Sequence, residues 1–228
     1  PNEYDKLMSS MGSKGTNAFT SFEQTVYVED IPNNVLDKYL TVQAERFRNP
    51  ILRLFHTELE SVYEEKNISL DNDNRKAIET IFAAMFPKNN YGKQTVLGSV
   101  EHLKNPSLKA IREYYTTYYV PNNMGVIMSG DFNPNDVIQR IDKSFSTMKP
   151  KAVPAYTFEK EQAITSPVTR TVMGPTAEYL LMGFRFPGAA DPDAQMLNLM
   201  ANVLTNGSAG LIDLNLVKSQ KLLGAGAF

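Results

Sequence analysis

The chain has 228 residues, of which 42 % are hydrophobic and 21 % are charged, and its formal net charge is −2. This composition is typical of a folded globular protein, and the length allows one large core or two smaller ones. The small net charge gives no electrostatic basis for binding nucleic acid or an anionic membrane. No run approaches the roughly 18 apolar residues of a membrane span. Cysteine is absent, which excludes disulfides and thiolate metal ligands.

The first thirty residues predict one helix followed by two neighbouring strands. The helix is expected over Asn2–Met11 and is closed by Gly12. A strand is expected over Thr16–Ser21, and its neighbour over Gln24–Glu29. In the second strand Thr25, Tyr27 and Glu29 alternate with valines, a pattern typical of a half-buried strand.

Most of the following hundred residues read as helices joined by polar turns. Pro50 suits a first helical position, and the Asn and Asp residues near 71–74 suit a loop and a helix cap. An apolar strand is expected over Met124–Ser129. The expected helices cover residues 34–47, 50–67, 72–86, 106–119 and 134–145.

The composition changes at Lys149, where a proline-rich stretch without helical periodicity begins. We interpret residues 149–167 as a linker between a first domain, 1–148, and a second domain that begins at 168. Strands are expected at 168–173, 179–186 and 222–228, and helices at 191–204 and from Leu211. This mixture favours an α+β fold in two layered units over a doubly wound sheet.

The helix expected over 50–67 carries four glutamates, and helical geometry separates them into two pairs. Each residue turns by about 100°, so residues seven apart nearly coincide. Glu58 and Glu65 therefore fall within the stripe that contains Ile51 and Val62, and we expect both to face inward. The other two, at 60 and 64, fall on the far side as ordinary surface charges.

A carboxylate on a buried stripe is costly unless it is paired, hydrogen-bonded or bound to a metal. A salt bridge to a core cation and a helix end that reaches water remain open as alternatives. A catalytic zinc site commonly combines a glutamate with two histidines, but this chain has only His56 and His102. His56 points away from Glu58, and His102 is isolated. If Glu65 is a metal ligand, the histidines lie outside residues 1–228.

Several strings together resemble the insulinase/pitrilysin-type zinc peptidases, peptidase family M16. They include the E-x-x-x-V-x-x-E pattern at 58–65, the string NAFTS at 17–21, and the run from FPKNNYG to MSGDF. A weaker likeness continues from Tyr179 and is similar to the start of the family's second, related domain. The resemblance implies two related domains of the LuxS/MPP-like metallohydrolase fold, each an antiparallel-rich sheet flanked by helices.

The resemblance also implies a chemistry. In the family an HxxEH helix supplies two zinc-binding histidines and a general base, and a glutamate 75 to 80 residues further on completes the zinc site. Glu65 matches that third ligand, and Glu58 matches a carboxylate that orients ligands or stabilises the site. Counting back places HxxEH before Pro1, so we expect both domains to be truncated and this piece to be inactive alone.

Asn17, Ala18 and Phe19 match the family's edge strand, which binds an extended peptide by strand addition. A plain hairpin strand is the alternative reading of NAFTS. Family members cut peptides in a chamber closed by a second half, supplied by the same chain or a partner subunit. We therefore expect a zinc endopeptidase or, alternatively, a non-catalytic homologue that holds peptides. The bacterial form of the resemblance and the lack of cysteine favour a periplasmic or other extracytoplasmic location.

Overall fold

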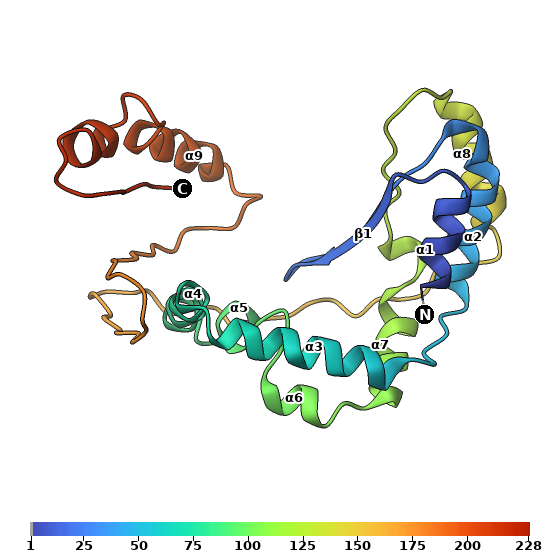
Figure 1. Cartoon of the computed structure of the whole chain (residues 1–228), viewed down its shortest axis with the longest axis horizontal. Helices are drawn as coiled ribbons and strands as arrows, with labels where there is room; N and C mark the ends of the chain where they lie inside the picture. The colour runs from blue at the N-terminus through green and yellow to red at the C-terminus, as the bar shows by residue number, and fades with distance from the viewer. Residues whose placement is uncertain (1) are drawn as a thin grey trace. The chain divides into compact units, whose positions relative to one another are not determined.

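The computed structural model describes residues 2–228, and they fall into two compact units, 2–181 and Met182–Phe228. Helices predominate, and two strands form one antiparallel sheet (Figure 1). The α+β class is therefore confirmed. No helix within the described residues is long and apolar enough to cross a membrane.

The first unit begins with the helix and strand pair that the sequence predicted. Helix α1 spans Glu3–Ser10, and Gly12 follows it with φ +87°, a backbone conformation that glycine adopts without strain. Strands β1 (Gly15–Thr20) and β2 (Thr25–Asp30) pair antiparallel, with Thr16 opposite Glu29 and Thr20 opposite Thr25. The pair projects from the helices as a hairpin (Figure 1).

The core of the first unit lies between α2 (Leu36–Arg48) and α8 (Pro134–Phe145). A short 3₁₀ turn, Asn33–Val35, leads into α2. Leu36, Leu40 and Val137 are the buried centre, and partly buried side chains surround them: Ile31, Tyr39, Met128, Phe132, Ile141 and Phe145. The two helices lie side by side in Figure 1, so this core supports the base of the hairpin.

The helices between these two are α3 (Phe55–Leu70), α4 (Asp73–Met85), α5 (Asn90–Lys93), α6 (Val100–Lys104) and α7 (Leu108–Tyr118). Helix α3 begins at Phe55 rather than at the expected Pro50, because Leu54 has a non-helical backbone conformation. Its buried side is marked by Lys66 and Ser69. The Lys66 ammonium lies 3.4 Å from a Glu79 carboxylate oxygen on α4, which joins the two helices.

Four expected strands are wrong: 124–129, 168–173, 179–186 and 222–228 are all non-helical but unpaired in the structure. The apolar patterns that suggested strands are present, but a strand requires a neighbour that completes its hydrogen-bond ladder. Within residues 2–228 only β1 and β2 supply such neighbours to each other.

A cleft of about 1440 Å³ separates β2 from the extended residues 123–132. Its walls include the core residues Leu36 and Leu40 and the aromatic side chains Tyr39 and Phe47. On the far wall, Ile127 is 97 % exposed. The sheet and the extended segment thus face each other across open space.

Residues 149–181 follow the surface of the first unit and are attached to it at several points. The Asn122 side chain exchanges two hydrogen bonds with the backbone of Lys151. A Glu161 carboxylate oxygen accepts the N–H groups of Lys88 (2.7 Å) and Asn89 (2.8 Å). Near the end, Thr176 donates both its N–H and its hydroxyl to Asp73 at the start of α4. The predicted linker region is therefore extended and anchored.

The second unit contains α9 (Asp193–Leu204) and a π-helical turn, Asp213–Val217. The intervening NGSAG loop is closed by Asp213, whose carboxylate oxygen Oδ2 accepts the N–H groups of Asn206, Gly207 and Gly210. These amides are consequently engaged by the protein itself. The NGSAG loop, residues 206–210, is therefore a connection closed by its own hydrogen bonds.

Candidate functional site

The side chains of Asn17, Ala18 and Phe19 are all exposed on β1. One edge of β1 pairs with β2, and within the described residues no strand covers its other edge. An uncovered edge offers unpaired backbone groups to another extended segment. The structure thus brings the predicted substrate-binding residues to a position that strand addition requires.

The register identifies which backbone groups of β1 point outward. Ser21 donates its N–H to the Gln24 carbonyl at 2.8 Å, so 21 and 24 form a hydrogen-bonded pair. Hydrogen-bonded pairs alternate in an antiparallel ladder, which turns the amides of Thr16, Ala18 and Thr20 toward the open edge. The Ala18 N–H donates instead to the side-chain oxygen Oδ1 of its neighbour Asn17, at 2.8 Å.

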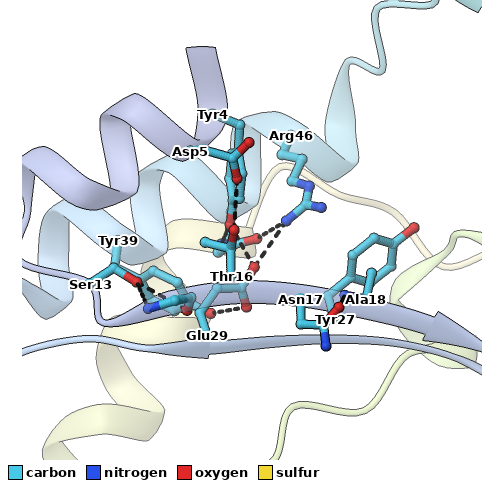
Figure 2. A network of polar contacts seen from close by, with 12 residues as sticks. Tyr4, Asp5, Ser13, Thr16, Asn17, Ala18, Tyr27, Glu29, Tyr39 and Arg46 are labelled. Carbon is cyan, nitrogen blue, oxygen red and sulfur yellow. Dashed lines mark hydrogen bonds and ion pairs between the residues drawn. The ribbon is translucent and has the colours of Figure 1, made fainter. Parts of the chain in front are cut away.

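Polar side chains of Tyr4, Glu29, Tyr39, Gln43 and Arg46 form a partly buried hydrogen-bonded cluster, which we name the Glu29 cluster. Figure 2 shows it, with Tyr4, Glu29, Tyr39 and Arg46 labelled. The Glu29 side chain is only 3 % exposed. Its Oε1 accepts from the Tyr4 hydroxyl (2.6 Å) and from Arg46 (3.1 Å), and its Oε2 accepts from the Tyr39 hydroxyl (3.0 Å). Gln43 donates to the Tyr4 oxygen. The cluster joins α1, β2 and α2.

Local sequence explains how these groups meet. Tyr39, Gln43 and Arg46 are spaced by four and three residues, so they share one face of α2. The Arg46 guanidinium carbon also lies 4.2 Å from the Tyr4 ring centroid and 4.5 Å from that of Tyr27. The cation is therefore held between a carboxylate and aromatic faces.

The cluster changes the acidity of its tyrosines. Burial, together with the hydrogen bond to Glu29, raises the pKa of Tyr4 to about 12. Burial and the nearby Glu29 carboxylate also raise the pKa of Tyr39. Both hydroxyls thus remain protonated donors at neutral pH, which is the state that a buried carboxylate needs.

The expectation that Glu58 and Glu65 face inward is wrong, because both side chains are exposed on α3. The apolar residues near the same face are exposed with them, including Leu54 at 55 % and Ile68 at 71 %. Val62 on the same stripe is half-buried and Ser69 is buried, so the described residues cover this face of the helix only in part. Of the alternatives left open, a helix end that reaches water describes Glu58, which lies in the first turn of α3, whereas Glu65 is exposed inside the helix.

No group of three or more potential metal ligands occurs within the described residues. His56 is exposed on α3, and His102 completes a capping box with Ser99 at the start of α6. The proposed roles of Glu58 and Glu65 in binding a metal stay predictions.

Sequence reasoning missed the Glu29 cluster. The strand pattern placed Glu29 beside Tyr27 on one face but did not indicate which face meets the helices. The signal was present in the spacing of Tyr39, Gln43 and Arg46, a polar stripe on a helix that lies beside the strand pair. Such a stripe opposite a strand glutamate indicates a buried ion pair.

Comparison with known proteins places this geometry in a family. Residues 1–98 match the family model described as insulinase (peptidase family M16), and residues 106–228 match the one described as the peptidase M16 inactive domain. The chain belongs to peptidase family M16. The resemblance seen in its motifs is thereby confirmed.

Similar proteins include a bacterial zinc protease and a mammalian insulin-degrading enzyme. The chain is 28 % identical over 229 residues to the zinc protease PqqE of Helicobacter pylori, covering 96 % of this chain and 51 % of the relative. It is 28 % identical over 161 residues to mouse insulin-degrading enzyme, covering 67 % of this chain and 16 % of that enzyme. The chain thus spans about half the length of the first of these relatives, and less of the second.

Solved structures show the same fold. The crystal structure of a protease from Helicobacter pylori superposes with a TM-score of 0.77 at 24 % identity, covering 96 % of this chain and 54 % of that one. The first half of the periplasmic protease PqqL from Escherichia coli gives a TM-score of 0.61 at 19 % identity, covering 69 % and 36 %. At these identities the likeness establishes the fold alone.

Proposed function

We propose that these 228 residues are part of a longer protein, here called the parent protein. We further propose that the parent protein is a zinc-dependent endopeptidase that cuts peptides bound as an added strand along β1. The observation that carries this proposal is that Glu58 and Glu65 share one open face of α3 in a chain of the M16 family. Relatives named zinc proteases support the same chemistry. The 228-residue chain alone is expected to be inactive, since it offers only part of a zinc site.

The spacing of the two glutamates supports different roles for them. Seven residues correspond to about 10 Å of helix rise, so the two carboxylates cannot readily share one ion. Glu65 is proposed as the zinc ligand, with the histidines supplied from outside residues 1–228. Glu58 is proposed to orient a ligating side chain or stabilise the site rather than to bind the metal. Zinc in such a site lowers the pKa of bound water and polarises the scissile carbonyl.

The edge of β1 supports the binding half of the proposal. The outward amides of Thr16, Ala18 and Thr20 repeat every second residue, as the backbone of an extended peptide does. Exposed side chains on both faces of β1 leave room for a substrate. Asn17, Ala18 and Phe19 are accordingly proposed to contact the peptide, with backbone pairing providing affinity that does not depend on sequence.

The rest of the proposal concerns the whole protein. A second M16 half, in the same chain or a partner subunit, is proposed to close a chamber around the substrate. PqqL of Escherichia coli, whose first half has a similar fold, is a periplasmic protease. On that likeness and on the absence of cysteine, a periplasmic location is proposed for the parent protein. Substrate identity is left to experiment.

A non-catalytic homologue that holds peptides is the second candidate. Two buried carboxylates without a metal would count against this candidate, because an uncompensated buried charge is costly. Glu58 and Glu65 are exposed, so their burial does not distinguish the two candidates. Metal content therefore has to decide between the two candidates.

The deciding experiment measures zinc and peptide cleavage in the parent protein and in Glu65→Gln. We expect one zinc per parent chain, and loss of both zinc and activity in the variant. Glu64→Gln is the matched control, because Glu64 is exposed on the same helix but turned away from that face. A parent protein that cuts peptides without zinc, or a Glu65→Gln variant that keeps both, contradicts the proposal. A parent protein with neither zinc nor activity supports the non-catalytic candidate.

A further inference from the structure

The Glu29 cluster carries more polar contacts than a surface hairpin requires. Its carboxylate is almost completely buried and accepts three hydrogen bonds, from α1 and α2. A buried carboxylate is costly unless it is fully partnered, and an apolar pair in its place would often be as stable. The hydrogen bonds of Glu29 therefore serve to fix the position of β2 relative to α1 and α2 more than to add stability.

A second contact ties the other strand to the same helix. The Thr16 hydroxyl donates to Asp5 Oδ1 on α1 at 2.7 Å. Thr16 lies directly opposite Glu29 in the hairpin, so both strands are attached to α1 at one cross-strand pair (Figure 2). Tyr4 and Asp5, which make these contacts, are adjacent residues.

This attachment lies beside the proposed substrate edge. Ala18, with its outward amide, is two residues beyond Thr16, and residues 17–20 are exposed. The hairpin is thus anchored at its base, while its outer part is open. A strand advances about 3.3 Å per residue, and a one-residue slip reverses the faces of every side chain. A small shift of β1 relative to α1 would therefore change which bond of a peptide paired with β1 lies at the catalytic site.

We propose that Glu29 and Thr16 are positioning residues that set the register of a bound peptide, and hence the bond that is cut. Their side chains act by fixing β1 against α1, without touching the substrate, and the substitutions tested below leave the Thr16 backbone amide in place. This inference rests on the proposed function and names a determinant of cleavage site within it. It assigns the Glu29 cluster a role in specificity beyond stability.

The test uses the parent protein and an unstructured peptide with several cleavable bonds, and mass spectrometry measures the fraction cut at each bond. In Thr16→Val and Glu29→Gln we expect cutting at bonds next to the main site to rise at least severalfold relative to the main site. Glu101→Ala is the control, because its exposed ion pair with Lys104 lies on α6. Its cleavage pattern should match the wild type.

The outcomes separate the two levels of the argument. If the variants lower the rate or the melting temperature but leave the distribution of cut bonds unchanged, the cluster is structural only and the inference is overturned. If Glu29→Gln does not fold, Thr16→Val decides alone, since it removes a single surface hydrogen bond. A wild-type protein that cuts no peptide overturns the proposed function first, and this inference with it.

Discussion

The β2–α2 region and the exposed face of α3 both carry acidic side chains, but they treat them in opposite ways. Glu29 is enclosed and held by two tyrosines and an arginine. Glu58 and Glu65 stand in solvent, and within residues 2–228 no ion pair holds them. The chain compensates the charge of the first region, whereas within residues 2–228 the charges of the second region are exposed to solvent.

The contrast extends to the apolar residues around these carboxylates. Leu40 on α2 is 2 % exposed, while Leu54 at the start of α3 is 55 % exposed. Both are leucines on segments that the sequence predicted to be helical. Periodicity therefore identifies a face that can be covered, and the structure shows which face the described residues cover.

The largest expected effect comes from matched leucine truncations. Leu40→Ala should lower the free energy of unfolding of the 228-residue chain by about 2–5 kcal/mol, because it empties a packed core position. Leu54→Ala should change it by less than about 0.5 kcal/mol, as a surface substitution does. Urea unfolding measures both.

The same pair sharpens the comparison in the parent protein. If the α3 face is covered there, Leu54→Ala should become more costly by roughly 1 kcal/mol or more. If Leu54→Ala has the same small effect on stability in the 228-residue chain and in the parent protein, this face of α3 is exposed in both.

A matched pair of arginine substitutions tests the charge side of the comparison. Arg46→Met leaves Glu29 buried without its cation and should cost about 3 kcal/mol of stability. Arg53→Met removes an exposed arginine near α3 and should change stability by less than about 0.5 kcal/mol. Thermal unfolding of both variants provides the measurement. Similar small effects would mean that the Glu29 cluster contributes little to stability.

The smallest effect concerns alkaline pH. Because burial first, and then Glu29, raises the pKa of Tyr4 to about 12 from its usual value of 10.0, the unfolded chain releases this proton more readily than the folded one. Its contribution to stability is present below pH 10 and is lost as the pH rises toward 12. Tyr4→Phe should therefore lose less stability over this interval than the wild type, as chemical unfolding at several pH values can show. Parallel losses would contradict the assignment.

Local signals in the sequence predicted the helices and the hairpin well. Asn72 caps α4 where the Asn and Asp residues near 71–74 indicated a helix cap. Both strands of the hairpin lie within one residue of their expected bounds. These features depend on short-range hydrogen bonds that the local residues determine.

Features that depend on distant partners could not be read in the same way. Residues 124–129 have a strand pattern, but pairing depends on a neighbour that residues 2–228 do not supply. The prediction that Glu58 and Glu65 face inward was wrong for a related reason. An apolar stripe on a helix does not show which other element packs against it. Glu29 was missed because its partners come from two other elements.

The cleft beside β2 has a practical consequence for the chain on its own. Val126 and Ile127 are exposed on a stretch of extended backbone whose amides are unpaired within the described residues. Apolar, uncharged β-prone backbone of this kind acts as a template for edge-to-edge aggregation. Concentrated solutions of the 228-residue chain are therefore expected to aggregate through the segment that contains Val126 and Ile127. The solubility of the chain then indicates whether another strand or a partner covers that segment.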